Sequence, residues 1–162
     1  MTNDINGLQQ NNWKFELKRL PNTVFFINSI NLPGVTMNAL DYDNQLIKIP
    51  VPGDKLTFNT LNIEFTVDEN LNNYFEIFDW MKGLGFADNF EQYKTLKASE
   101  DGIYSDASLV ITTNSNTPNV TINFKDMFPT DLSDLTFDIL NEELLKCSVT
   151  FTYQSWDYQR VT

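Results

Sequence analysis

The chain has 162 residues, of which 41% are hydrophobic and 14% aromatic, and this predicts a single globular domain over residues 1–162. Its 20% of charged residues and its mean hydropathy of −0.31 exclude collagen-like, coiled-coil and low-hydrophobicity disordered chains. Eleven basic and 22 acidic residues give a net charge of −11, the opposite of what a protein that grips nucleic acid by its phosphates needs.

The N-terminal residues and the number of cysteines indicate the cellular compartment in which the chain is made. Residues 1–12 are polar and lack the charged start and apolar stretch of a signal peptide, so we expect a flexible polar arm. No window approaches the roughly 18 consecutive apolar residues of a membrane span. Cys147 is the only cysteine and cannot form an intrachain disulfide. These observations predict cytosolic synthesis and no membrane partner.

Apolar and polar residues alternate along much of the chain, as half-buried antiparallel strands require. The clearest alternations cover residues 13–18, 61–68, 120–125 and 147–154. Further strands are predicted at residues 24–28, 46–49, 55–58, 108–112 and 135–139. The predicted fold class is therefore mainly β, an antiparallel β-sandwich or barrel.

One segment breaks this pattern and predicts an amphipathic α-helix over residues 70–82 that covers a face or end of the sheets. Its apolar stripe, at steps of three and four, consists of Leu71, Tyr74, Phe75, Phe78 and Met81. Acidic and capping residues at 68–70 suit the helix start, and Gly83 and Gly85 suit its end. If the Phe78 ring is buried, Phe78→Ala should cost about 3–5 kcal/mol.

Three connections are expected to be irregular. Residues 86–105 carry mixed charges without a period and predict a surface loop with a short helical turn, while 114–119 predict a hairpin loop. Pro52 and Gly53 suit the centre of a type II turn. Because Pro50 and Pro52 remove two donors from one strand edge, that strand either ends there or borders solvent.

The chain contains no histidine, which removes the usual general base, the commonest neutral metal ligand and every Ser-His or Cys-His nucleophile. Cys147 falls on the apolar side of a predicted strand and is expected to be an inert core thiol. Cys/His zinc sites and glycine-rich phosphate loops do not occur. The sequence therefore predicts no catalytic residue, no cofactor, no metal and no enzymatic activity.

Two acidic segments have to be weighed as sites. Residues 41–44 begin like a calcium loop, but Leu46 stands where that loop needs glycine and Pro52 where it needs a bidentate Glu. A second group, which in principle offers the carboxylate pair of a glycosidase, consists of Asp126, Asp131, Asp134 and Asp138. The turn-like stretch after Pro129 favours capping and surface solvation instead. Three aromatic residues that could stack on sugars or bases, but are more typical of core or interface, are Trp13, Trp80 and Trp156.

Four segments occur in an order that points to one family. They are YDNQLIKIPVPGD at 42–54, LNIEFTVDE at 61–69, the helix residues Phe75, Phe78, Asp79 and Trp80, and FPTDLSDL at 128–135, with a final strand at 147–158. In order and spacing, over roughly residues 15–158, they resemble the tail tube proteins of contractile-tailed bacteriophages. In that family a Gly-Asp turn precedes an alternating strand that ends in an acidic pair.

The resemblance implies a structural virion protein whose hexameric rings stack into a hollow tube inside a contractile sheath, with strands joining into a ring-wide barrel. The implied partners are further copies of the chain, the tail sheath protein, and the baseplate and tail-terminator proteins. Assembly would take place in the bacterial cytoplasm. DNA would pass through the lumen without specific binding. A ring of six would carry a formal charge of −66, six times −11, and any part facing the lumen would repel DNA.

The resemblance places the candidate contacts between subunits in a projecting hairpin. The apolar candidates are Leu46, Ile49, Leu56 and Phe58, for which a plain core role is the equal alternative. Charge reversal at Lys48 or Lys55 should impair polymerisation more than folding. Other functions stay open: a baseplate tube-initiator, a tail-terminator ring or a bacterial injection-system tube of the same fold, or an acidic β-sandwich that binds carbohydrate or peptide.

Overall fold

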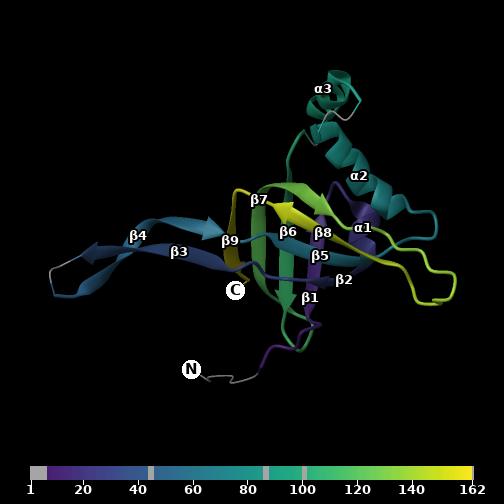
Figure 1. Ribbon diagram of the computed structural model, residues 1–162. Coiled ribbons are helices and arrows are strands. Elements are labelled where there is room, and N and C mark those ends of the chain that lie inside the picture. The colour runs from purple at the N-terminus through teal and green to yellow at the C-terminus, as the bar shows by residue number, and fades with distance from the viewer. Residues whose placement is uncertain (1–6, 44–45, 86–87, 100–101, 162) are drawn as a thin grey trace.

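The computed structural model describes residues 7–43, 46–85, 88–99 and 102–161, and these form a mainly antiparallel β fold (Figure 1). The strands are β1 (Trp13–Leu17), β2 (Ile27–Ile30), β3 (Val35–Asp43), β4 (Lys48–Phe58), β5 (Leu61–Thr66), β6 (Ser105–Thr112), β7 (Pro118–Leu132), β8 (Lys146–Thr152) and β9 (Ser155–Arg160). The helices are α1 (Pro21–Phe25), α2 (Asn72–Gly85) and α3 (Phe90–Ala98). The predicted fold class is confirmed. The final strand expected at 147–158 is two strands, β8 and β9, each of which pairs with β7.

Strand β7 belongs to two sheets. Sheet A has the order β1-β6-β7-β9, and sheet B has the order β7-β8-β5-β2. The change of sheet falls near Asp126, which has a φ of 52° and lies beside a register shift between Ser105 and Ala107. The Asp126 backbone N–H donates to Asp106 Oδ1 at 3.1 Å. Such a bulge bends a strand and increases its twist, so β7 can turn out of one layer into the other.

The core lies between the two sheets because the two-residue alternation points one set of side chains inward from every strand. Register pairs in sheet A align Phe15 with Leu109 and Leu109 with Ile122, while sheet B aligns Phe65 with Cys147. All of these side chains are buried. Helix α2 covers one end of the sandwich (Figure 1), where the Trp80 ring lies 6.2 Å from the Phe151 ring.

The helix predicted at 70–82 is α2, but its predicted apolar stripe is only partly buried: Tyr74 and Met81 pack against the core, whereas Phe75 and Phe78 do not. Phe75 and Phe78 are 48% and 45% exposed, and the buried residues of α2 are Asn73, Ile77, Trp80 and Gly83. Polar contacts set this rotation: Asn73 Nδ2 donates to the Thr66 carbonyl at 2.8 Å, and Trp80 Nε1 donates to the Ile103 carbonyl at 3.1 Å. Both donors would lose their acceptors if the helix turned toward the predicted face.

The strand predicted at 24–28 is also wrong in its first half. Pro21 starts α1, where its missing N–H costs nothing, and β2 begins only at Ile27. The Thr23 hydroxyl donates to the Asn73 carbonyl of α2 at 3.1 Å. This tertiary contact holds a helical turn in a stretch of strong β-forming residues.

Three further expectations need correction. The predicted loop 86–105 contains α3, whose first turn is capped by the Asn89 side chain accepting from the Glu91 N–H at 3.0 Å; residues 86–87 and 100–101 lie outside the described residues. The strand predicted at 135–139 is part of the β7–β8 connection, in which Leu135 packs against the core and the following residues are exposed. Alternation alone does not make a strand, and this segment pairs with no described strand. Asp131, expected in a turn, lies in β7. The hairpin loop expected at 114–119 is found between β6 and β7.

Candidate functional site

A two-stranded ribbon projects from the sandwich. Strands β3 and β4 pair with each other alone among the described strands, and they extend far beyond the body of the protein (Figure 1). The predicted type II turn at Pro52 and Gly53 is wrong, because β4 runs through both residues. Pro50 and Pro52 therefore lie in a strand that borders solvent, one of the two alternatives that their missing donors allowed.

A bulge divides the ribbon into a proximal and a distal half. Met37 pairs with Leu56 and Ala39 with Pro52, so three residues of β4 face the single Asn38 of β3. A Cβ on Gly53 would lie 2.2 Å from the Asn38 carbonyl oxygen, which explains why glycine occupies this position.

The distal half has one apolar face and one polar, proline-containing face. Directly paired residues share a face, and two pairs make the apolar one: Leu40 with Val51, and Tyr42 with Ile49. The pairs of the other face are Ala39 with Pro52, Asp41 with Pro50, and Asp43 with Lys48. All four apolar side chains are exposed. The ribbon thus presents an uncovered apolar surface.

The structure spreads the six predicted contact residues along the whole ribbon. Leu46, Lys48 and Ile49 are exposed at its far end, and Lys55 and Leu56 are exposed at and beside the bulge. Phe58 lies at the base, where its ring is 6.1 Å from the Tyr153 ring and 6.4 Å from the Trp156 ring. Phe58 therefore packs on the body, and the other five side chains do not.

Sequence reasoning missed the β3 half of this surface. Val35, Met37, Leu40 and Tyr42 are all exposed apolar residues of β3. These apolar residues have odd numbers before Asn38 and even numbers after it, so no uninterrupted two-residue alternation predicts the strand. Reading the two halves on either side of Asn38 separately would have found it.

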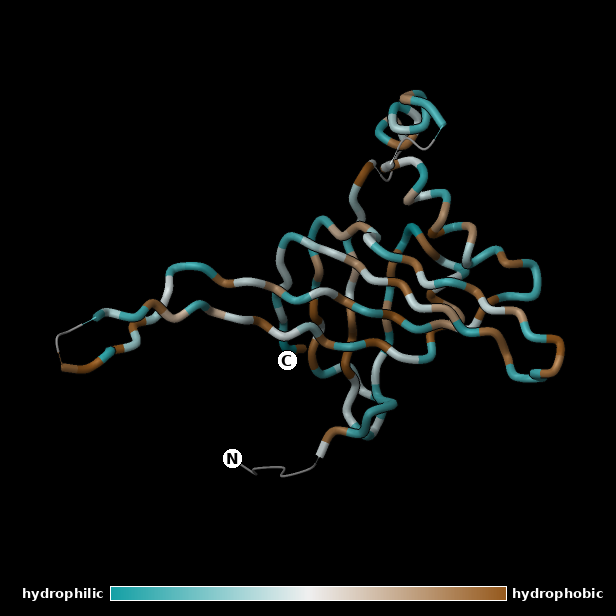
Figure 2. Tube along the Cα trace, in the orientation of Figure 1, coloured by the Kyte–Doolittle hydropathy of each residue, from teal (hydrophilic) through white to brown (hydrophobic). Residues whose placement is uncertain are grey.

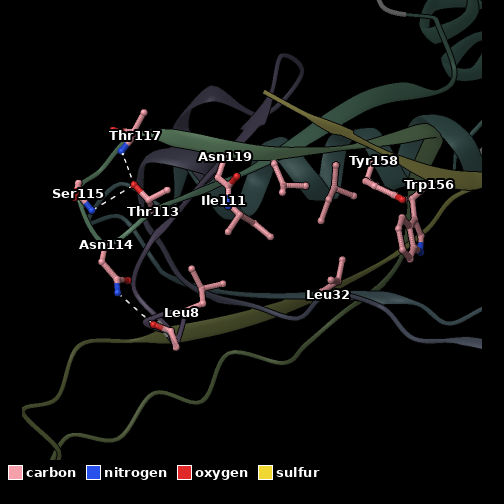
Figure 3. A pocket seen from close by; sticks show the side chains of 13 residues that line it. Leu8, Leu32, Ile111, Thr113, Asn114, Ser115, Thr117, Asn119, Trp156 and Tyr158 are labelled. Carbon is pink, nitrogen blue, oxygen red and sulfur yellow. Dashed lines mark hydrogen bonds between the residues drawn. The ribbon is translucent and has the colours of Figure 1, made fainter. Parts of the chain in front are cut away.

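A groove opens at the base of the ribbon (Figure 3), with a volume of about 890 Å³. Its apolar lining comes from Leu8, Leu32, Ile111, Val120, Trp156 and Tyr158, and amide and hydroxyl side chains of the β6–β7 loop form one rim. None of its thirteen described lining residues is charged. The buried Trp156 Nε1 has no hydrogen-bond partner among the described residues.

Part of the predicted N-terminal arm is fastened beside this groove. Asn114 Nδ2 donates to the Gly7 carbonyl at 3.2 Å, and Asn12 Nδ2 donates to Asn114 Oδ1 at 2.9 Å. Asn12 is buried, so the arm expected over 1–12 is anchored at this end. Residues 1–6 lie outside the described residues.

A second exposed apolar region is the connection between β7 and β8 (Figure 2). Its uncovered side chains are Phe137, Ile139, Leu140 and Leu144. Its acidic residues are Asp134, Asp138, Glu142 and Glu143. The carboxylates weighed as a glycosidase pair are spread from the β7 bulge to this connection, and Asp41 and Asp43 of the calcium-loop candidate lie in β3 of the ribbon. The described part of the chain brings no three potential metal ligands together.

Cys147 and Trp80 occupy the core rather than a site. The Cys147 thiol is buried 3.3 Å from the Ser133 hydroxyl, and burial raises its pKa above the ordinary value of 9.0. A protonated, enclosed thiol is a poor nucleophile. Trp80 is buried, while Trp13 and Trp156 are half-buried against the core. Among the described helices, none has the length and apolar composition needed to cross a membrane.

Comparison with known proteins gives one family and a set of similar folds. The family model described as phage tail tube protein matches residues 5–159. A search of curated proteins finds no match. The tube-terminating cap of the anti-feeding prophage superposes with a TM-score of 0.64 at 16% identity, over 96% of this chain and 93% of that chain.

Two structures of an extracellular contractile injection system, named PVC, are also similar. The sheath/tube terminator has a TM-score of 0.67 at 15% identity, over 95% of this chain and 97% of that chain. The sheath-tube complex has a TM-score of 0.64 at 16% identity, over 98% and 95%. At these identities the likeness establishes the fold.

Proposed function

The chain belongs to the phage tail tube protein family, and on that premise we propose that it is the subunit of the inner tube of a contractile tail. Copies join into hexameric rings, and the rings stack around a channel. The ribbon contacts a neighbouring copy, the sheath surrounds the tube, and baseplate and terminator proteins close its ends. The site of action is the virion tail, assembled in the host cytoplasm.

The observation that carries this proposal is that β1 and β9, the outer strands of sheet A, each pair on one side only among the described strands. In the order β1-β6-β7-β9 each strand is antiparallel to the next, so β1 and β9 run in opposite directions. Rotation about an axis along the strands would therefore place β9 of one copy antiparallel to β1 of the next. Closure of the ring leaves no lateral edge exposed, and a repeated head-to-tail contact of this kind closes into a ring or a helix.

The polar face of sheet A suits the wall of a channel. The outward side chains between the core positions are mainly Ser, Thr, Asn and Gln. The ionisable ones are Lys14, Glu16, Asp106, Lys125 and Asp157. Two cations and three carboxylates leave −1 per subunit, or −6 per ring of six, compared with −66 for the whole ring. Such a wall repels DNA weakly and offers no basic patch that would hold it.

Negative-stain microscopy of the purified protein over a range of salt concentrations tests the proposal. We expect rings and tubes, favoured by salt because screening weakens the repulsion between subunits of charge −11. Assembly that stops at single rings would identify a terminator or initiator ring, a possibility supported by the fold likeness to a tube-terminating cap. Monomers that persist at all salt concentrations would refute the proposed function.

A further inference from the structure

We propose that the groove at the ribbon base receives the ribbon tip of a second copy of this chain. The tip is defined by Leu46 and Ile47, together with the apolar distal face described above. The inference rests on the proposed function and deepens it, because it names the surface that the projecting ribbon meets.

The distribution of charge favours contact between the ribbon tip and the groove. Every copy carries −11, so most of the surface of one copy repels most of the surface of another. The groove has no charged residue in its described lining, and the apolar ribbon face of Leu40, Tyr42, Ile49 and Val51 has none either. Contact through this pair of surfaces buries apolar area without bringing like charges together.

Geometry excludes a chain's own tip as the occupant. Strand β4 has 11 residues, which span roughly 35 Å at about 3.3 Å per residue. The groove lies at the other end of the ribbon, since Leu32 precedes β3 and Trp156 packs on Phe58. A tip that fills a groove must therefore come from another copy.

The tip presents exposed apolar side chains, and the groove has an apolar lining that can bury them. Leu46 is 89% exposed and Ile47 is exposed beside it, as expected of side chains that are buried only on assembly. The groove offers the apolar side chains of Leu8, Leu32 and Tyr158. Amide and hydroxyl groups along its rim can pair with the unpaired backbone edges of an arriving ribbon.

Tip and groove are different surfaces of one molecule, so their contact is heterologous and propagates. A mixing experiment follows. Leu46→Asp destroys the tip and keeps the groove, whereas Leu32→Asp destroys the groove and keeps the tip. Each variant alone should lose roughly tenfold or more of its sedimentable polymer, because a carboxylate would be buried in an apolar contact. An equimolar mixture should form a species of twice the mass of either variant's own unit, and growth should stop there.

Leu140→Asp is the matched control, since Leu140 is also 89% exposed but lies in the β7–β8 connection. It should polymerise like the wild type. Asn119→Glu on the groove rim repeats the groove test without touching an apolar side chain. Thermal unfolding curves of all variants should match the wild type, which separates lost assembly from lost folding.

The outcomes separate this inference from the proposed function. Tubes of Leu32→Asp and Asn119→Glu that equal the wild type would overturn the inference and leave the tube function standing; the groove would then be covered by the chain's own residues or by another protein. Variants that do not pair on mixing would also overturn it. A wild type that forms neither rings nor tubes would instead refute the proposed function.

Discussion

Gly53 and Asn38 face each other across the ribbon so closely that a Cβ on Gly53 would lie 2.2 Å from the Asn38 carbonyl oxygen. Real Cβ contacts never come this near, so any side chain at 53 must push β3 and β4 apart at the bulge. At the bulge, the apolar residues of both strands switch between odd-numbered and even-numbered positions. The geometry of the bulge therefore sets the direction in which the distal apolar face is presented.

Gly53→Ala should abolish or strongly reduce assembly while thermal unfolding stays near that of the wild type. The ribbon joins the body through Phe58 at its base, so distortion at the bulge leaves the core intact. Gly85→Ala is the control, because a Cβ there meets nothing within 4 Å. Electron microscopy and calorimetry of both variants provide the measurement. Normal tubes from Gly53→Ala would show that the bulge geometry is not needed.

Two neighbouring substitutions in α2 test which face is buried. Ile77 is fully buried, so Ile77→Ala should lower the free energy of unfolding by about 2–5 kcal/mol. Phe78 is 45% exposed, and Phe78→Ala should cost about 1 kcal/mol or less. Urea titration followed by circular dichroism measures both values. The reverse order would mean that α2 is rotated relative to the face described here.

Charge reversal on the ribbon should impair assembly more than folding. Lys48 pairs with Asp43 across the strands, so Lys48→Glu sets like charges opposite each other at the far end. Lys55→Glu adds a fourth acidic group to the ribbon, directly beside Asp54. Both variants should melt within a few degrees of the wild type and yield fewer tubes.

The control is Lys97→Glu on α3, which makes the same charge change away from the ribbon. It should assemble normally in the same sedimentation assay. Tubes of wild-type length from both ribbon variants would disprove the contact role of this segment.

The buried thiol predicts a loss of stability at alkaline pH. Burial raises the pKa of Cys147 above 9.0, so the unfolded chain releases this proton at lower pH than the folded protein does. The stabilisation is complete below the unfolded pKa and is lost as pH rises through the folded pKa. Tyr153, whose pKa burial raises above 10.0, contributes with the same sign.

Cys147→Ser keeps the side-chain size and removes the thiol titration. Urea unfolding between pH 8 and pH 10 should show a shallower decline for this variant than for the wild type. Equal slopes would mean that the thiol has the same pKa in both states. Slow reaction of the native thiol with an alkylating reagent at pH 8 is the companion measurement.

Sequence patterns predicted most of the strands because pleated strands impose a local, two-residue period. Residues 13–18, 61–68 and 147–154 alternate without interruption, and all three form strands of the sandwich. The same rule failed at 135–139, where the alternation is present but the segment pairs with no described strand. It failed again at 24–28, where contact with Asn73 holds a helical turn.

The candidate surface was predictable in part. Leu46, Lys48, Ile49, Lys55 and Leu56 were named from the resemblance, and all of them are exposed on the ribbon. The β3 side of the ribbon was missed, because its bulge hides the alternation. The groove was missed as well, since its lining comes from segments that are distant in sequence.

By itself, the chain's composition and periodicity determined the antiparallel β class, the presence of a helix after 68 and the lack of histidine chemistry, because these depend on residue identity and short-range spacing. Only the tertiary structure decided which side of α2 is buried, how β7 serves two sheets and where Phe58 packs. Each of these features depends on groups far apart in sequence that compete for the same space and the same hydrogen bonds. Local sequence patterns therefore cannot predict them.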